Sequence, residues 1–336
     1  MSHKPVTFKL LDLPLLAMEH VIRTMDLKAM FFFSLISTKA KNLLKCFLPK
    51  NAFHLTYQFS TDAIITLRSP SCNQEQSGDR SEFRLTDVIE EDTTSHMING
   101  ILFKISVPNE FNKEMIQHDG SFENVIQALM THFVESFNSP KVSLDFGYDY
   151  TPENALLILN HAKSLNVELM EVAYCNERIP IPAEVYKAFL DVGPRVVQML
   201  DLYSDAPDGF QYRPSETFNL DEFQLGDGDW VYLEDFMECK NISIRVSHAD
   251  SQKFNGFFKS WKGSRCRLEE LEVNKFDDNP FVFEEVIEGL DGTNYKEEAM
   301  IQSVDIQRED GVKARIQLIH RFDSNHWDVL RMYVLH

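Results

Sequence analysis

The segment Leu13–Leu44 constrains the fold of this chain most, because its apolar residues recur at helical spacing. We expect three short helices there. Their apolar positions are Met18, Val21, Ile22 and Met25 in the first, Met30 and Phe31 in a short second turn, and Ile36, Ala40, Leu43, Leu44 and Phe47 in the third. Three helices in about 35 residues bury too little apolar surface to be stable alone. The rest of the chain or a partner must cover them, which predicts a docking module.

The same segment resembles the F-box, in order and without a gap. The matching positions are Leu13-Pro14, Val21-Ile22, Met25-Asp26, Met30, Phe33-Ser34-Leu35-Ile36 and Ser37. Two positions depart from the common pattern, since Leu27 stands where many F-boxes have proline and Ala40 where many have tryptophan. The resemblance implies a three-helix F-box over residues 8–52.

An F-box implies an adaptor that binds a Skp-type linker protein and, through it, a cullin, in a Skp–cullin–F-box ubiquitin ligase. Carried over by position, the residues that contact the Skp-type protein are Leu13, Pro14, Ile22, Met25 and Leu35. An alternative for Ile22 and Leu35 is that they only hold the three helices together.

The charge of the chain is unevenly distributed. Residues 1–50 carry a net charge of +5, whereas the whole chain of 336 residues carries −19. An acidic body is a poor partner for a phosphate backbone, so we expect no nucleic-acid binding. A basic N-terminal segment would attract an acidic partner protein, although incidental lysines on a solvated helix face are the alternative.

Composition indicates a soluble intracellular protein in the cytoplasm or the nucleus. The chain is 43% hydrophobic, which suffices for a large core and suggests two domains. Its five cysteines are scattered and never at CxxC spacing, so we expect reduced thiols without a disulfide framework or zinc site. The N-terminus lacks an apolar signal segment, and no run approaches the ~18 apolar residues of a membrane span.

The region 53–139 is predicted to connect the F-box to the rest of the chain as an α/β segment. Alternation indicates one or two strands in residues 54–68 and another in 100–107. Residues 69–81 are polar and read as an exposed loop. A helix is expected at 121–137.

Residues 140–336 contain a weak repeat, which predicts a leucine-rich-repeat-like α/β body. Its short strands are Met170–Val172, Leu200–Leu202, Ile244–Val246 and Leu271–Val273, and each follows a helical pattern, at 152–165, 182–192, 230–239 and 251–261. The strands recur at intervals of 30, 44 and 27 residues, and we assign the long interval to an extra loop around residues 206–214.

The same body is similar to the type 2 F-box-associated domain of nematode F-box proteins, most clearly at Phe254–Phe276 and Asp305–Ile316. That resemblance implies a substrate-recognition domain without catalytic residues. A C-terminal hairpin should pair Ile306 with Ala314 around the loop Glu309-Asp310-Gly311, and a last strand is expected at Val329–Leu335.

Chemical motifs are weak. The chain has no phosphate loop, no GxSxG elbow and no HExxH helix. Neighbouring His and Asp residues occur at His248 and Asp250 and at His326 and Asp328, without a nucleophile at a defined turn. Asp227-Gly-Asp229 and Asp277-Asp278-Asn279 lack the ligand spacing of a calcium loop, and helix N-caps explain them better. We predict no catalytic residue, no metal and no cofactor.

Substrate contact is assigned from the repeat. In each strand the flanking apolar residues face the core, so the middle residues Glu171, Asp201, Arg245 and Glu272 should share one exposed face. Tyr174 and Tyr203 are placed near its rim. This mostly acidic face would favour a basic target segment, and a merely solvated face is the alternative.

The predicted fold is therefore α/β, with an F-box followed by a repetitive substrate-recognition body. The predicted function is that of a non-catalytic adaptor presenting a protein substrate to a ubiquitin ligase. One alternative is a Skp-binding scaffold or inhibitor that presents no substrate. A weaker one is an enzyme that uses the His and Asp neighbours.

Overall fold

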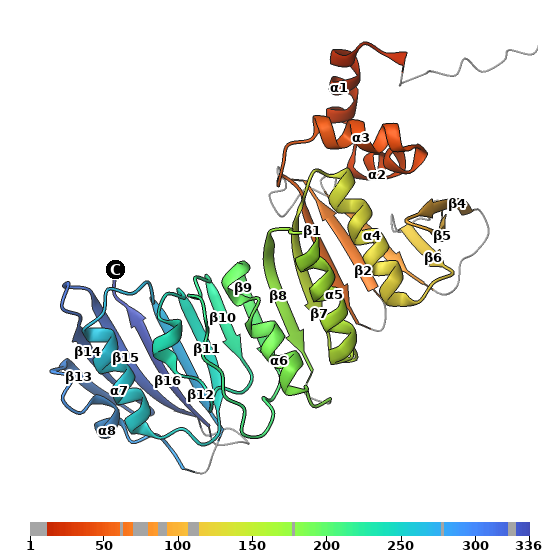
Figure 1. Ribbon diagram of the computed structural model, residues 1–336. Coiled ribbons are helices and arrows are strands. Elements are labelled where there is room, and N and C mark those ends of the chain that lie inside the picture. Colours follow the sequence, from red (N-terminus) through yellow and green to blue (C-terminus); the bar gives the residue numbers. More distant parts are fainter. Residues whose placement is uncertain are drawn as a thin grey trace, which may run out of the picture. The chain divides into compact units, whose positions relative to one another are not determined.

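The computed structural model describes residues 12–60, 63–69, 80–86, 93–106, 114–176, 179–276, 279–321 and 327–336. These residues form eight α-helices and 16 β-strands (Figure 1). The chain divides into two compact units, each considered by itself below. Unit 1 comprises Met1–Leu144 and Leu157–Glu168, and unit 2 comprises Asp145–Leu156 and Leu169–His336.

Three helices occupy the N-terminal segment as predicted: α1 Leu15–Thr24, α2 Leu27–Ile36 and α3 Thr38–Phe47. The carboxylate of Asp26 caps α2 by accepting a hydrogen bond from the amide of Ala29 at 2.6 Å. The second helix is longer than the expected short turn, and Ile36 ends it instead of beginning the third. The reason is Ser37, whose extended backbone separates the helices and whose hydroxyl caps α3 at 3.2 Å from the Ala40 amide.

The sheet of unit 1 follows these helices. Its strands are β1 His54–Phe59, β2 Ala63–Arg68, β3 Arg80–Leu85, β4 Thr93–Ile98, β5 Ile101–Ser106, β6 Glu114–His118 and β7 Lys141–Phe146, in the order β7-β1-β2-β3-β6-β5-β4. The strands predicted at 54–68 and 100–107 are thus present. Most of the predicted loop 69–81 lies outside the described residues, and its last two positions already belong to β3.

The predicted helix at 121–137 is α4, Phe122–Ser136, and it covers the N-terminal helices. The ring of Phe31 on α2 stacks on that of Phe133 on α4 at 5.0 Å and lies 4.6 Å from that of Phe83 on β3. Lys41 on α3 pairs with Glu135 on α4 at 2.7 Å. The rest of unit 1 therefore supplies the cover that the helices need.

The two compact units do not coincide with the three predicted segments 8–52, 53–139 and 140–336. The segments 8–52 and 53–139 share one core and belong to unit 1, as far as they are described. Unit 1 also continues to Leu144 and takes back Leu157–Glu168. The change from one unit to the other thus falls within β7 and within α5, Pro152–Ser164, rather than at residue 139.

Unit 2 is built on a larger sheet. Its strands are β8 Leu169–Cys175, β9 Val196–Tyr203, β10 Glu222–Leu225, β11 Asn241–Val246, β12 Glu270–Lys275, β13 Thr293–Glu298, β14 Ile301–Gln307, β15 Lys313–Arg321 and β16 Trp327–Val334. Their order is β13-β14-β15-β16-β12-β11-β10-β9-β8. Strands β8 to β12 run parallel, and β16 lies antiparallel between β12 and β15.

The connections in unit 2 are less regular than predicted. Helices α6 Ala183–Leu190 and α7 Ser251–Lys262 match two of the predicted ones, and the short α8 Phe283–Ile287 follows β12. The pattern at 230–239 forms only a 3-10 turn, Leu233–Phe236. The interval of 44 residues holds a fifth parallel strand, β10, instead of a loop alone. A repeat of the leucine-rich type is therefore not confirmed.

The C-terminal hairpin has the predicted register. Ile306 on β14 pairs with Ala314 on β15, and the amide of Arg308 donates to the carbonyl of Val312 at 2.8 Å. These contacts enclose the three-residue loop 309–311, in which Gly311 adopts a φ of +93°. A left-handed glycine at this position relieves the strain of closing the hairpin with a bulge.

Candidate functional site

The parallel strands of unit 2 bury one face and leave the other open. Tyr174 on β8 is fully buried, and its ring lies 5.3 Å from that of Phe189 on α6, so this face carries the helices. Figure 1 shows α6 and α7 on the same side of the sheet. We call the other side, which α6 and α7 do not cover, the open face.

All four predicted middle residues, Glu171, Asp201, Arg245 and Glu272, lie on the open face, but they do not form one row. The register aligns Asp201 with Gln224, Ser243 and Glu272. Glu171 lies one row away, opposite Met199, and Arg245 lies one row away in the other direction, opposite Asn274. Because side chains alternate with a period of two, the sequence pattern can slide by two residues without changing the face.

The two predicted tyrosines separate. Tyr203 lies at the end of β9 on the open face, with 38% of its surface exposed. Tyr174 is not at the rim, because it alternates in phase with Val172 and faces the core. Its hydroxyl donates to the carbonyl of Tyr150 at 3.1 Å, and burial raises the pKa of Tyr174 to about 12.

Asp201 is the most perturbed acid on the open face. Burial raises the pKa of its carboxyl to about 6, with smaller contributions from the negative charges of Asp145 and Glu222. Its Oδ1 atom is buried and accepts no hydrogen bond from the described residues. A cation bound beside Asp201 would favour its charged form.

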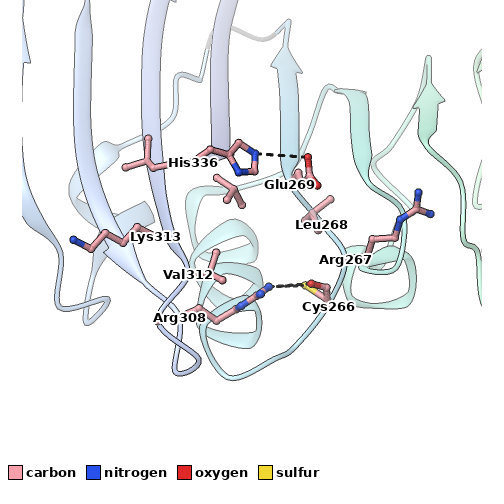
Figure 2. A pocket seen from close by; sticks show the side chains of 11 residues that line it. Cys266, Arg267, Leu268, Glu269, Arg308, Val312, Lys313 and His336 are labelled. Atoms are coloured by element: carbon pink, nitrogen blue, oxygen red, sulfur yellow. Dashed lines mark hydrogen bonds and ion pairs between the residues drawn. The ribbon is translucent and has the colours of Figure 1, made fainter.

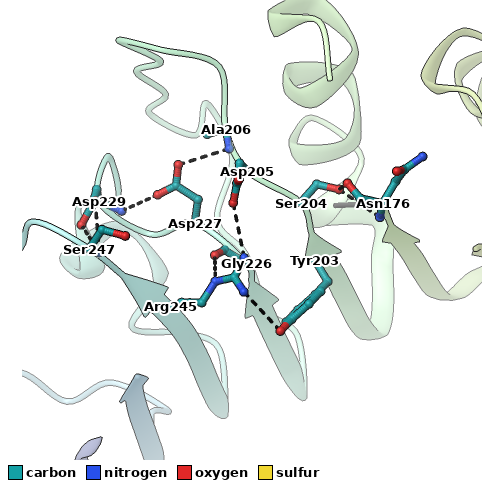
Figure 3. A network of polar contacts seen from close by, with 10 residues as sticks. All are labelled: Asn176, Tyr203, Ser204, Asp205, Ala206, Gly226, Asp227, Asp229, Arg245 and Ser247. Carbon is teal, nitrogen blue, oxygen red and sulfur yellow. Dashed lines mark hydrogen bonds and ion pairs between the residues drawn. The ribbon is translucent and has the colours of Figure 1, made fainter. Parts of the chain in front are cut away.

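Arg245 organises the carboxyl ends of β9, β10 and β11 (Figure 3). Its guanidinium donates to the carbonyl of Gly226 at 2.7 Å, to the hydroxyl of Tyr203 at 3.3 Å and to the carboxylate of Asp205 at 3.3 Å. It also lies 4.9 Å from the centre of the Tyr203 ring. Three strands are thus joined by one side chain.

Asp227 and Asp229 hold the adjoining loops together. Asp227 accepts hydrogen bonds from the amides of Ala206 at 3.2 Å and Asp229 at 3.1 Å, and burial is the main cause that raises the pKa of Asp227. Asp229 accepts from the amides of Ser247 and His248, each at 3.1 Å. These aspartates bridge loops and do not cap helices, which corrects the expectation from the sequence. Asp277 and Asp278 lie outside the described residues.

A pocket of about 450 Å³ opens among these loops. Its acidic lining residues are Asp205, Asp208, Asp227 and Asp229, and Phe210, Trp230, Arg245 and His248 also contribute. Ligands of parallel sheets commonly bind beyond the carboxyl ends of the strands. Excess negative charge and aromatic walls suit a basic side chain here.

A second pocket, of about 530 Å³, lies at the amino end of β12 (Figure 2). Arg308 there donates to the carbonyl of Cys266 at 3.0 Å and pairs with Asp310 at 2.9 Å. It also lies over the ring of Trp261 at 5.2 Å. These contacts tie the β14–β15 hairpin to α7, which is a structural role.

The two predicted His and Asp pairs contain the carboxylates of Asp250 and Asp328, and both carboxylates contact other groups among the described residues. Asp250 caps α7 by accepting from the amide of Lys253 at 2.8 Å. His326 lies outside the described residues, and Asp328 instead contacts His320 at 2.7 Å while accepting from the amide of Phe281. Both carboxylates are thus engaged in fixing the backbone or a neighbouring strand.

The predicted Skp-contacting residues differ in accessibility. Pro14 is exposed, and Leu13, Met25 and Leu35 are half-buried. Ile22 is completely buried between the helices, which favours the alternative that it holds them together.

Three apolar residues that the prediction omitted are more accessible: Leu15 at 63%, Leu16 at 80% and Ile36 at 69% exposed. A sequence signal existed for Leu15 and Leu16, because they fall outside the apolar positions that repeat on the first helix, whereas the pattern assigns Ile36 to the apolar face of the third helix. We call Leu13, Pro14, Leu15, Leu16 and Ile36 the N-terminal apolar residues.

Other kinds of site were also sought. In the part of the chain that the structure describes, no three His, Cys, Asp or Glu side chains are grouped so that they could hold a metal ion. Within the same residues, no helix combines the length and apolar character needed to cross a membrane. No disulfide joins the four described cysteines.

Residues 216–273 match the family model described as F-box associated. The match covers β10, β11, α7 and part of β12, together with most of the loops that line the acidic pocket. The chain is also similar to a Caenorhabditis elegans protein named Skn-1 dependent zygotic transcript 15 protein. The two are 23% identical over 338 residues, which is 93% of this chain and 94% of the relative. The chain is thus similar to F-box-associated proteins over residues 216–273 and to a nematode protein over most of its length.

Solved structures resemble the chain only weakly. An uncharacterized protein from Listeria monocytogenes serotype 4b aligns at 7% identity over 64% of this chain and 67% of its own, with a TM-score of 0.18. An S-adenosylmethionine-dependent methyltransferase from Clostridium acetobutylicum aligns at 8% identity over 62% of this chain and 63% of its own, with a TM-score of 0.10. Similarities this low indicate neither a shared fold nor a shared activity.

Proposed function

We propose that this chain is the substrate-recognition adaptor of a Skp–cullin–F-box ubiquitin ligase. Helices α1 to α3 act as the F-box and bind a Skp-type protein, and unit 2 binds the protein substrate. The chain itself transfers no ubiquitin, and it acts in the cytoplasm or the nucleus by bringing a substrate close to the other subunits. The observation that carries the proposal is the F-box-associated match at residues 216–273.

The N-terminal helices support the docking role because they pack on the rest of unit 1 and also carry exposed apolar residues. One surface packs on α4 and β3 through Phe31 and Lys41. Away from these contacts lie the N-terminal apolar residues, which are Leu13 to Leu16 at the start of α1, with Leu16 80% exposed, and Ile36 at the end of α2. Exposed apolar residues that gather on one element mark protein-binding surfaces more often than scattered ones do.

The geometry of unit 2 supports the substrate role. The loops beyond β10 and β11 lie within the matched residues 216–273, and they line the acidic pocket. Asp201 and Glu222 extend the negative charge onto the open face. Such a surface favours a basic segment of a protein substrate.

Co-expression with a Skp-type protein tests the docking role. We expect the parent chain to co-purify with it and Leu16→Asp to lose binding by roughly tenfold or more, since a charge would replace an apolar contact. Met97→Asp is the matched control, because Met97 is 66% exposed on β4. Failure of the folded parent chain to bind, or an equal loss in both variants, would contradict the proposal.

Substrate presentation separates the adaptor from the alternative, a scaffold or inhibitor that binds a Skp-type protein without a substrate. Proteins that bind the chain should accumulate in cells when the Leu16→Asp variant replaces the parent. Bound proteins whose abundance stays unchanged, despite intact Skp binding by the parent, would favour the scaffold.

A further inference from the structure

A continuous row of rings and guanidinium groups crosses the carboxyl edge of unit 2. Its members are Tyr203 on β9, Arg245 on β11, Phe276 after β12, Trp327 on β16 and Arg321 on β15, and we call them the aromatic–arginine row. Along the row, Arg245 lies 4.9 Å from the Tyr203 ring and 6.0 Å from the Phe276 ring. Phe276 and Trp327 stack at 5.3 Å with an angle of 6°, and Arg321 lies 4.4 Å from the Trp327 ring.

The row is accessible from solvent. Tyr203 is 38% exposed and Phe276 is 46% exposed, although rings of this size are usually buried. Stacking on one another orders these side chains before any partner arrives, so binding them costs little conformational entropy. Ordered, exposed aromatic and arginine side chains are the residue types that dominate binding energy at protein interfaces.

Charge beside the row indicates which partner it fits. Asp205 neutralises Arg245 and is itself 79% exposed. Arg245 also lines the acidic pocket, so the row and the pocket form one surface. The end of this surface at the pocket presents four aspartates. The whole chain has a net charge of −19. The complementary group is a basic side chain, whereas the far end of the row carries the positive charge of Arg321.

We propose that the row and the acidic pocket together bind an extended segment of a protein partner. That segment carries an Arg or Lys side chain that enters the pocket and a nearby aromatic side chain that packs along the row. This inference rests on the proposed function and deepens it, because it names the chemical class of the substrate segment.

Peptide binding to the full chain tests the inference. Four fluorescent peptides share a Gly-Ser framework and carry, respectively, Arg with Trp, Arg alone, Trp alone, and Glu with Trp. We expect anisotropy titrations to rank the Arg–Trp peptide first, by about fivefold over each single-residue peptide, as one additional contact of this kind contributes. The Glu–Trp peptide should bind most weakly.

Variants of exposed residues locate the binding. Phe276→Ser should lower the affinity for the Arg–Trp peptide by about fivefold. A double Asp205→Asn, Asp208→Asn variant should bind the Arg–Trp peptide no more tightly than the peptide that carries Trp alone. Tyr295→Ser is the control, because Tyr295 is 48% exposed on β13, away from the row. Equal loss in the Tyr295 variant, equal binding of all four peptides, or no binding of the Arg–Trp peptide would overturn the inference.

Two further outcomes are distinguishable. If the chain associates with itself and Phe276→Ser abolishes this without any peptide binding, the row is a contact between copies, and the inference is wrong. Co-purification with a Skp-type protein tests only the docking role of helices α1 to α3. Peptide binding without Skp binding would therefore retain this inference and refute the adaptor role.

Discussion

The Nε2 atom of His132 lies 2.7 Å from the Oγ atom of Ser34, and both side chains are buried. The Ser34 hydroxyl also lies 2.6 Å from the carbonyl of Phe31 and donates to it. Both contacts are satisfied together only when the Nε2–H group of His132 donates to Ser34. Because Ser34 belongs to α2 and His132 to α4, this hydrogen bond joins the N-terminal helices to the core of unit 1.

Acid should weaken this connection. Burial is the main cause that lowers the pKa of His132 to about 4, and the charge of Lys41 adds to it. The unfolded chain therefore takes up the proton first as the pH falls below about 6.5. The stability of unit 1 should be highest above that pH and should decrease by up to about 3 kcal/mol on acidification to about pH 4.

Urea unfolding at about pH 7 and about pH 5 would measure this effect in the parent chain and in His132→Gln. The amide of glutamine keeps a donor for Ser34 but does not titrate. The variant should therefore lose less stability than the parent between the two pH values. Identical losses would show that other groups cause the acid sensitivity.

Asp201 should have the opposite dependence on pH. Its pKa is raised to about 6, mainly by burial, so the folded chain holds the proton more tightly than the unfolded chain. Its favourable contribution is complete below about pH 4 and is lost as the pH rises through about 6.

Asp201→Asn should consequently stabilise unit 2 at neutral pH by about 1–2 kcal/mol, after allowance for partial exposure of the carboxyl. The gain should vanish near pH 4, where the parent is protonated. Thermal unfolding of both chains at the two pH values is the measurement. A variant that is less stable at neutral pH would show that the carboxylate has a partner in solution.

Gly226→Ala should disturb the candidate site. An added Cβ atom would lie 2.8 Å from the backbone nitrogen of Ser204, which no side-chain rotation can relieve. Separation of the ends of β9 and β10 should lower the free energy of unfolding by about 1–3 kcal/mol and weaken the binding of the Arg–Trp peptide.

Gly256→Ala is the matched control for this substitution. Nothing lies within 4 Å of its added Cβ on α7, and alanine should stabilise the helix by about 0.5–1 kcal/mol. Urea unfolding of both variants would measure the difference. Equal stability of Gly226→Ala and the parent would mean that the strand ends separate freely.

Gly311→Ala tests the hairpin turn by strain alone. Its added Cβ would meet only the side-chain nitrogen of Gln307, at 3.9 Å, whereas its φ of +93° is unfavourable for alanine. We expect a loss of about 1–2 kcal/mol without a change in the pairing of Ile306 with Ala314. Unfolding measurements combined with hydrogen exchange of the β14 and β15 amides would report both properties.

The faces of most elements were predictable from local patterns. The alternation around Leu200 and Leu271 assigned Asp201 and Glu272 to the open face correctly, because a period of two determines the side on which a residue lies. The same rule, applied strictly, would have placed Tyr174 in the core with Val172. The loop 309–311 was predictable, because a two-residue Asp-Gly loop would pair Ile306 with Arg315 and place apolar and polar side chains on the wrong faces.

Register and neighbours were not predictable in this way. Strand β10 has only two buried apolar residues, Phe223 and Leu225, so its pattern resembles that of a loop until parallel strands lie on both sides. The repeat predicted from the sequence aligns Ile244 with Leu200, whereas in the sheet Ile244 lies in the same row as Leu202. The sequence pattern does not distinguish these two alignments, because a shift of two residues leaves every side chain on the same face.

The sequence by itself determined that the N-terminal segment forms three helices, which face most strand residues occupy and how the last hairpin turns, because those properties depend on residues close along the chain. The tertiary structure decided that α4 covers these helices through Phe133 and His132. It also decided that Arg245 meets Tyr203, Phe276 and Asp205 at one edge. Such contacts join residues far apart in sequence, and their geometry depends on strand order and register, which local periodicity leaves open.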